Sequence, residues 1–358
     1  MRKAGRVPDR WLSLLDAAAD ACTAERAGSA RAVASSRARA PQKGSGMKMG
    51  DQVLSRRKFL LGSSAAVVGG LLTPGGASGL VSRPRQTARG LSARAGFGPT
   101  PITGATVNPT VYHMTNWVQA AKTFDGYVGY PLARTIQKFY MLEGRYPTKV
   151  PLRISEMANV GCKFIVCVYP SRKTDQRSQL RHFLMLLKSK GIVYQAALVN
   201  EWNCKDKFTP EAYLDYWRHY APVVKTAGVP LALMVLASSN RTAFAKLKHA
   251  FPTDPLPDAC WVDYYATGYL YNVRLATSGG PLDQAEKHGV PVGIGEFGWS
   301  ATGGRPAMKV WDEYCSYLHH LAPRLRLGCV YFGSGGVNEI KSAHDPKVPG
   351  LRKVVSGF

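Results

Sequence analysis

Two glutamates that each close an apolar run are the residues of this chain best placed to do chemistry. Glu201 lies in the segment LVNEWN (198–203) and Glu296 in the segment IGEFGW (294–299). An apolar run that ends at a lone carboxylate is typical of a buried strand that delivers a charged side chain to an open rim. If both segments are strands of one sheet, two carboxylates can face one substrate, one to donate a proton and one to attack it.

Either glutamate alone has a simpler interpretation. Most carboxylates on a protein are exposed to solvent or paired with a cation. The pair is more specific because both glutamates stand at matching positions, each with a tryptophan close behind it, Trp202 and Trp299. The elements around them decide whether the two segments meet.

The chain from residue 96 onward predicts eight strands separated by helices. Apolar runs begin at intervals of 28 to 38 residues, which is about the length of a strand, a loop, a helix and a second loop. The predicted strands are 103–107, 135–141, 163–169, 193–199, 231–236, 261–268, 291–295 and 328–332. Near-continuous apolar strands of this kind predict a parallel sheet that is buried on both faces.

Amphipathic stretches between the strands predict the helices. Segments 178–190 and 307–321 repeat their apolar residues at helical spacing, and segment 210–226 has Thr209 as a cap and Pro210 in its first turn. Eight βα units in about 250 residues predict an α/β fold, a (β/α)8 TIM barrel that forms one domain over residues 96–358. The alternative is an open doubly wound sheet. It would carry a glycine-rich phosphate turn after an early strand, and the sequence has none.

In a (β/α)8 barrel, the residues at the carboxyl ends of the strands line the active site. Glu201 follows the fourth predicted strand and Glu296 ends the seventh, so the two are expected to face each other across the barrel mouth. Hydrolysis of a glycosidic bond needs two such carboxylates, one as acid and the other as nucleophile or base. A separation of about 5 Å predicts a retaining mechanism, and one of about 6.5–9.5 Å an inverting mechanism.

The two segments resemble clan A of the glycoside hydrolases, the 4/7 barrel enzymes, over roughly residues 100–335. Asn200-Glu201 is similar to the Asn-Glu pair of that clan, and Glu296 in GEFG (295–298) is similar to its nucleophile. The resemblance implies a retaining hydrolase with Glu201 as acid/base and Glu296 as nucleophile. It also implies that Asn200 binds the 2-hydroxyl of the sugar and that Tyr269 contacts the nucleophile.

Within the clan, the segments look nearest to the β-mannanase-like family. Two positions depart from the pattern. That family has His where this chain has Asn200, and clan enzymes commonly carry Trp at the end of strand eight, where this chain reads YFGSGG (331–336). Trp202 and Trp299 are predicted to contact the substrate, because flat rings stack on the flat faces of sugars. Asn203, next to Trp202, is also predicted to bind the substrate.

The predicted substrate is a β-linked polysaccharide or oligosaccharide, because few long loops are present to enclose a single sugar. Mannan, glucan, galactan and envelope polymers all remain open at this point. The alternative function is a barrel without turnover that binds carbohydrate or serves in the cell envelope. Retention of both glutamates favours the enzyme over that alternative.

The first 95 residues are interpreted as a leader, which holds half of the chain's net charge of +24. Segment 47–79 has SRRKFL (55–60) before a short apolar run and small residues. That order is typical of a secretion signal, and the paired arginines resemble a twin-arginine (Tat) signal. We therefore expect export through the Tat translocon and a secreted, extracellular or cell-envelope protein. Segment 1–46 is interpreted as disordered or as a mis-called extension, and segment 80–95 as a linker.

Other classes of function find little support. The folded part has no run of Lys and Arg interleaved with aromatic residues, so no nucleic-acid partner is predicted. The histidines are scattered and no C-x-x-C motif occurs, so we predict no metal and no cofactor. The apolar run 60–72 is too short for a stable membrane span. The six cysteines after residue 96 are as compatible with buried thiols as with disulfides.

Overall fold

The computed structural model describes residues 100–141, 143–204, 208–237, 241–266, 275, 279–299, 307–334 and 336–358. The predictions for segments 1–46, 47–79 and 80–95, and for Tyr269, lie outside these residues. So do the last two residues of the predicted strand 261–268.

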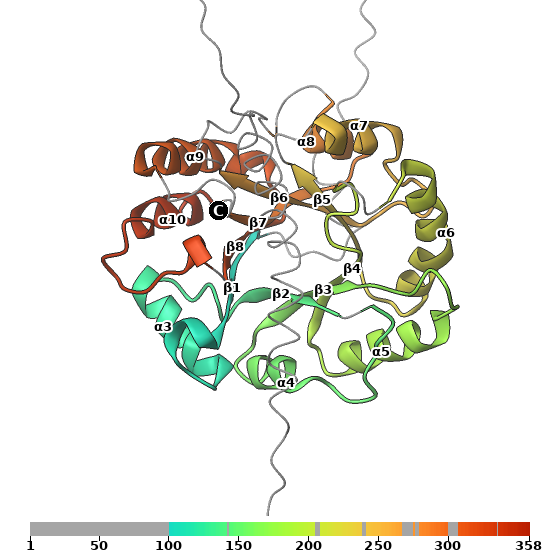
Figure 1. Ribbon diagram of the computed structural model, residues 1–358, viewed down its shortest axis with the longest axis horizontal. Helices are drawn as coiled ribbons and strands as arrows, with labels where there is room; N and C mark the ends of the chain where they lie inside the picture. The colour runs from blue at the N-terminus through green and yellow to red at the C-terminus, as the bar shows by residue number, and fades with distance from the viewer. Residues whose placement is uncertain are drawn as a thin grey trace, which may run out of the picture. The chain divides into compact units, whose positions relative to one another are not determined.

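Eight parallel strands form the centre of the described part, and helices surround them (Figure 1). The strands are β1 (Ile102–Val107), β2 (Ile136–Tyr140), β3 (Lys163–Val168), β4 (Val193–Leu198), β5 (Leu231–Ala237), β6 (Ala259–Ala266), β7 (Val292–Trp299) and β8 (Gly328–Gly333). They pair in the order β1-β8-β7-β6-β5-β4-β3-β2. The predicted (β/α)8 barrel is therefore confirmed, and each of the eight predicted strands has its counterpart.

The described helices lie between successive strands or after the last one. They are α3 (Trp117–Val128), α4 (Leu152–Ala158), α5 (Arg177–Ser189), α6 (Pro210–Thr226), α7 (Arg241–His249), α8 (Pro281–Lys287), α9 (Met308–Leu321) and α10 (Val348–Val355). Helix α6 begins and ends where its sequence predicts, because the Thr209 side chain accepts a hydrogen bond from the Ala212 backbone N–H at 3.2 Å and Pro210 occupies the first turn.

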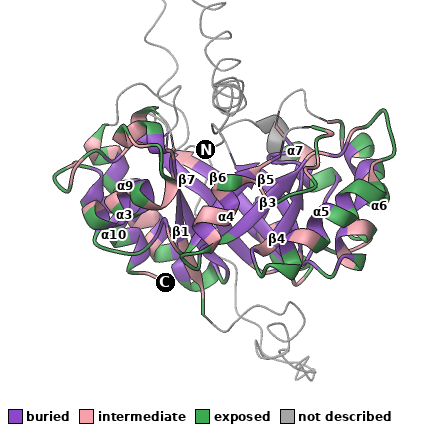
Figure 2. Ribbon diagram, turned by 90° about the horizontal axis from the view of Figure 1, so that it is seen from below, coloured by how far each residue is buried: buried purple, intermediate pink, exposed green. Residues whose placement is uncertain are grey.

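Each strand divides its side chains between two layers, and Figure 2 shows the strands buried between helices whose outer sides are exposed. The outer layer is the larger one. It packs strand residues such as Ile294, Phe297 and Tyr331 against the inner faces of the helices. The inner layer fills the barrel interior with residues that include Ile136, Ile165, Ala197, Met234, Trp261 and Val330. Alternation with period two therefore decides which strand residues can reach the site inside the barrel.

The barrel closes where β1 meets β2. The backbones approach so closely there that a Cβ at Gly104 would overlap the carbonyl oxygen of Ile136. The backbone N–H of Lys138 donates to the hydroxyl of Thr106 at 3.2 Å, so a side chain supplies an acceptor at this seam. Both residues are buried, with Thr106 3% exposed and Lys138 0% exposed. This hydrogen bond holds the backbone of Lys138, whose charged side chain is buried inside the barrel.

Two further findings concern cysteines and membranes. No disulfide joins any of the six cysteines in the described part of the chain, and all but the partly exposed Cys204 are buried. Burial raises the pKa of the Cys260 thiol to about 12, so this thiol stays protonated.

Among the described residues, no helix combines the length and the apolar character needed to cross a bilayer.

We predict that Thr106→Val destabilises the barrel although valine and threonine have nearly the same shape. The Lys138 N–H would lose its acceptor, and an unsatisfied buried donor costs about 1–3 kcal/mol. Thr106→Ser keeps the hydroxyl and should cost less than the valine variant. Urea unfolding of the three proteins measures the difference, and equal stability of the two variants would show that the seam does not depend on this hydrogen bond.

Candidate active site

Glu296 faces the barrel interior because β7 carries a bulge at this point. Ile294 pairs with Val262 of β6 and Glu296 pairs with Asp263, so two residues of β7 oppose a single step of β6. Without the extra residue, the alternation from Ile294 would turn the Glu296 side chain toward the helices. Bulges are a common means of re-aiming a side chain next to a functional site.

Strand β7 is longer than the sequence predicted. The sequence predicted a strand that ends at Gly295, whereas β7 continues through Glu296 to Trp299. Glu296 therefore lies within the strand, and its side chain is only 3% exposed. A glycine is required beside it. A Cβ at Gly295 would lie 2.6 Å from Asp263 Oδ1 and 2.8 Å from Met234 Cε.

The ammonium of Lys138 lies at the centre of the site. Lys138 comes from β2, and its Nζ donates to both carboxylate oxygens of Asp263 at 2.9 Å and to Asn200 Oδ1 at 3.0 Å. The same nitrogen lies 2.8 Å from Glu296 Oε1, an ion-pair contact. One buried cation thus joins residues that follow or belong to β4, β6 and β7.

The charges of this cluster oppose the effect of burial. Burial alone would lower the pKa of Lys138, but the carboxylates of Asp263 and Glu296 outweigh it and hold the pKa well above its usual value. Burial raises the pKa of Asp263, against the opposing charge of Lys138, and the charge of Glu201 raises it further. Lys138 is therefore a permanent cation in the barrel interior.

The other oxygen of Glu296 is held by a tyrosine. The hydroxyl of Tyr265, near the end of β6, donates to Glu296 Oε2. The Tyr265 ring also meets the ring of Phe332 edge to face, with 6.1 Å between the ring centroids. Both rings are partly exposed at strand ends. Lys138 therefore contacts one carboxylate oxygen of Glu296, and Tyr265 contacts the other.

Glu201 lies in a tight turn immediately after β4. Val199 has φ of 64° and Glu201 has φ of 48°, in the left-handed region that side chains other than glycine rarely adopt. The turn is held by the Val199 N–H, which donates to the Val168 carbonyl at 2.9 Å, and by the Asn200 N–H, which donates to the Tyr169 hydroxyl at 3.3 Å. Strained backbone of this kind is concentrated at functional sites.

The turn brings Glu201 into the same charged cluster. The Glu201 side chain is 4% exposed, and its charge acts on Asp263, whose carboxyl also accepts a hydrogen bond from the Asn200 side chain. Of the predicted site residues, the structure thus brings Glu201, Asn200 and Glu296 together around Lys138 and Asp263.

Three other predicted contacts have their side chains fully buried. Trp202 stacks on Tyr213 of α6, with ring centroids 4.0 Å apart and planes 2° from parallel. The Asn203 side chain exchanges two hydrogen bonds with the backbone of Leu236 in β5. The Trp299 backbone pairs with the Asn338 side chain. As placed, none of the three presents a side-chain surface to a ligand. Tyr269 is outside the described residues.

Sequence reasoning missed Lys138 and Asp263. Both lie in mostly apolar strands, IQKFY (136–140) and ACWVDYYA (259–266), next to outward-facing apolar residues such as Phe139 and Val262. A lysine in one such strand and an aspartate in another, both expected to point into the same barrel, is a signal that the sequence contains. Arg134, which precedes β2, is 37% exposed and pairs with Asp125 of α3 at 2.7 Å.

The floor of the site is an indole. Trp261 of β6 fills the barrel below Asp263, and its Nε1 donates to the Gln195 side chain of β4. A Cβ at Gly293 would lie 2.5 Å from the Trp261 ring, so glycine at this position makes room for it. The indole therefore fills the barrel interior beneath the charged cluster.

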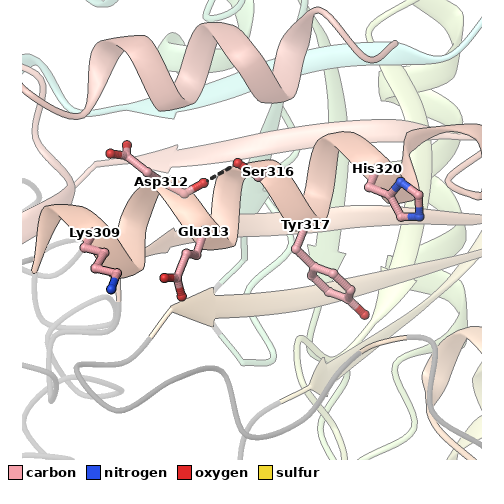
Figure 3. A pocket seen from close by; sticks show the side chains of 6 residues that line it. All are labelled: Lys309, Asp312, Glu313, Ser316, Tyr317 and His320. Atoms are coloured by element: carbon pink, nitrogen blue, oxygen red, sulfur yellow. Dashed lines mark hydrogen bonds between the residues drawn. The ribbon is translucent and has the colours of Figure 1, made fainter.

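A separate hollow of about 750 Å³ lies on the outer helical layer (Figure 3). Among the described residues, its lining side chains come from α9, and they are Lys309, Asp312, Glu313, Ser316, Tyr317 and His320. None of them belongs to the cluster around Lys138. The described residues hold no group of three or more His, Cys, Asp or Glu side chains arranged to bind a metal ion.

Comparison with known proteins found solved structures that are similar to this chain. No family model matches the sequence. No curated protein matches it either. A GH128 (subgroup I) endo-β-1,3-glucanase from Amycolatopsis mediterranei, in complex with laminaritriose, is similar with a TM-score of 0.41 and 12% identity over 73% of this chain and 100% of that chain. Saccharomyces cerevisiae Gas2p, in complex with laminaritriose and laminaritetraose, gives 0.46 and 12% over 72% of this chain and 64% of that chain.

We predict that Gly295→Ala destabilises the protein, by about 1–3 kcal/mol, because the added methyl must displace Asp263 or Met234 in a packed interior. Gly126→Ala is the matched control. A Cβ at this position in α3 meets nothing within 4 Å, so alanine should raise stability by up to about 1 kcal/mol. Denaturant midpoints of the three proteins measure both effects. A Gly295→Ala variant as stable as the parent protein would show that the bulge tolerates a side chain.

Proposed function

We propose that this chain is a glycoside hydrolase that cleaves β-linked polysaccharide by a retaining, double-displacement mechanism. The observation that carries the proposal is the state of Glu296. It is a buried carboxylate aimed into the barrel by a bulge, with Lys138 against one oxygen and Tyr265 against the other. Such a carboxylate is oriented by contacts on both oxygens, which is what a nucleophile at a sugar carbon requires.

Glu201 supplies the second role. In the first step, a carboxylate oxygen of Glu296 forms a bond to the anomeric carbon. The bond from that carbon to the leaving sugar breaks, and the leaving oxygen takes a proton from Glu201. In the second step, Glu201 takes a proton from water, the water oxygen bonds to the anomeric carbon, and Glu296 leaves as a carboxylate. The clustering of both glutamates near Asp263 supports this division of roles.

The substrate is proposed to be a polymer that crosses an aromatic rim. Tyr140, Tyr169, Tyr265 and Phe332 are partly exposed at the ends of β2, β3, β6 and β8, and rings of this kind bind the apolar faces of sugars. These rings take the place of the buried Trp202 and Trp299 as candidate sugar contacts. The twin-arginine-like leader adds the proposal that the enzyme is exported through the Tat translocon and acts outside the cytoplasm.

We predict that Glu201→Gln and Glu296→Gln each lower polysaccharide hydrolysis by about 10³-fold or more, because Glu201 transfers the proton and Glu296 forms the bond to the sugar. Release of reducing ends from β-1,3-glucan, β-1,4-glucan, β-mannan and β-galactan measures the loss. Glu211→Gln, at an exposed glutamate in the first turn of α6, is the matched control and should keep full activity. A parent protein that binds one polymer but cleaves none would make the chain a carbohydrate-binding barrel.

We predict that the first sugar released from a β-linked substrate is the β-anomer, because two successive displacements restore the original configuration. Proton NMR of the anomeric region during the first minutes of hydrolysis distinguishes the anomers before they equilibrate. Initial appearance of the α-anomer would mean a single displacement by water, with Glu296 as general base.

A further inference from the structure

Two loops at the rim of the barrel carry positive charge that the hydrolysis of a neutral sugar does not need. Residues 143–151 follow β2 and residues 169–176 follow β3, so these loops lie at the carboxyl ends of two paired strands (Figure 1). We call them the cationic loops. Their exposed cations are Arg145, Lys149, Arg172 and Lys173, and their exposed acids are Glu143 and Asp175.

The charge of the cationic loops is not neutralised locally. Among the residues that the structure describes, none of the four cations forms an ion pair with a carboxylate. Asp175 is paired elsewhere, because it accepts from the Arg177 guanidinium at 2.7 Å and lies 3.5 Å from Nε2 of His219. Glu143 is then the one other acid of these loops, so their surface has a net positive charge.

The two cationic loops are joined into one surface. The Gln176 side chain donates to the Gly144 carbonyl at 3.2 Å and accepts from the Ser171 N–H at 2.7 Å. The Gly144 N–H donates to the Tyr169 carbonyl at 3.0 Å. Arg145 follows Gly144 directly, and Arg172 follows Ser171. The backbone therefore holds one arginine of each loop in a fixed relation to the other loop.

Arg172 is also oriented by its side chain. Its guanidinium lies over the ring of Phe208, 4.7 Å from the ring centroid. Phe208 packs in turn on Tyr213 and Tyr216 of α6. Stacking uses the face of a guanidinium and leaves the N–H groups on its edge for a ligand, and that planar fork matches a pair of negatively charged oxygens. A cation that served only solubility would need no such support.

Tyr169 connects the cationic loops with the candidate active site. Its hydroxyl accepts a hydrogen bond from the Asn200 N–H at 3.3 Å, in the turn that carries Glu201. Arg172 is three residues further along the chain, so the Cα atoms of Tyr169 and Arg172 are at most about 11 Å apart. A polymer that crosses the rim at Tyr169 therefore passes close to Arg172.

The charge at the centre of the site is opposite to that of the cationic loops. The carboxyl groups of Glu201, Asp263 and Glu296 outnumber the ammonium of Lys138. An acidic group on the sugar at the cleaved bond would face this excess of carboxyl groups. The same group on a neighbouring sugar would be attracted by the cationic loops.

We propose that the substrate is an acidic polysaccharide, whose carboxylate or phosphate groups bind Arg145 and Arg172 while an uncharged sugar occupies the cleavage point. This inference rests on the function proposed above and adds the charge of the substrate to it. Arg172 supplies the oriented contact, and Arg145 supplies a second cation on the joined loop.

The first experiment compares acidic and neutral forms of the same polymer. Glu201→Gln protein is used, so that binding is measured without turnover. Carboxymethyl and phosphate derivatives of β-1,3-glucan and β-1,4-glucan are compared with hydroxyethyl derivatives of the same backbones by affinity electrophoresis. We expect an acidic form to bind about 10-fold more tightly than its neutral counterpart at low salt. The difference should largely disappear at about 0.5 M NaCl, because salt screens exposed charges.

Variants of the arginines assign the preference to the cationic loops. In the same background, Arg172→Gln and Arg145→Gln should each weaken binding of the acidic form by about 5-fold, and neither should change binding of the hydroxyethyl form. Lys190→Gln is the matched control. It removes one exposed positive charge at the far end of α5, away from the carboxyl ends of the strands, and should change neither affinity.

Three results would overturn the inference. They are equal binding or no binding of the acidic and hydroxyethyl forms, a preference that both arginine variants retain in full, and equally tight binding of polyglutamate, an acidic polymer without sugars. Release of reducing ends by the parent protein separates this inference from the proposed function. Arginine-dependent binding of an acidic glucan without cleavage of any polymer rejects the function alone, whereas cleavage without a preference for acidic forms rejects the acidic substrate alone.

Discussion

An ammonium group enclosed in a barrel dominates this structure. A lysine side chain without contact to solvent is costly unless anions and hydrogen-bond acceptors replace the water it has lost. Lys138 meets that requirement with oxygen atoms from Asp263, Glu296 and Asn200. These partners come from across the barrel, so they converge only when β2, β4, β6 and β7 all have the correct register. The charged cluster and the register of the sheet therefore depend on each other.

Space in the interior follows from the same constraint. Asp263 and Trp261 project from alternate positions of β6, and β7 makes room for both with Gly295 and Gly293. The bulge at Gly295 then turns Glu296 inward beside Asp263. Strand β7 thus has glycine at two interior positions, and Glu296 is the side chain that it directs into the barrel. The result is a carboxylate with a filled barrel interior beneath it.

The sequence was sufficient for the architecture because the strands recur at nearly regular intervals and their apolar runs are continuous. It also singled out Glu201 and Glu296 as candidates, because a carboxylate at the end of an apolar run is conspicuous. It was not sufficient for Lys138 and Asp263, which are 125 residues apart in the sequence and meet only when the barrel forms. Nor did alternation reveal the bulge in β7, since an inserted residue leaves no mark in the pattern of apolar residues.

Asn200 shows why a residue's neighbours in space matter more than its place in a motif. Its oxygen accepts from Lys138, its side chain donates to Asp263, and it is 7% exposed. A sugar hydroxyl that bonded to Asn200 would have to replace one of these contacts and so would loosen the cation beside Glu296. Recognition of the substrate is therefore better served by the partly exposed rings of Tyr169, Tyr265 and Phe332, which can bind sugar without disturbing the charges beneath them.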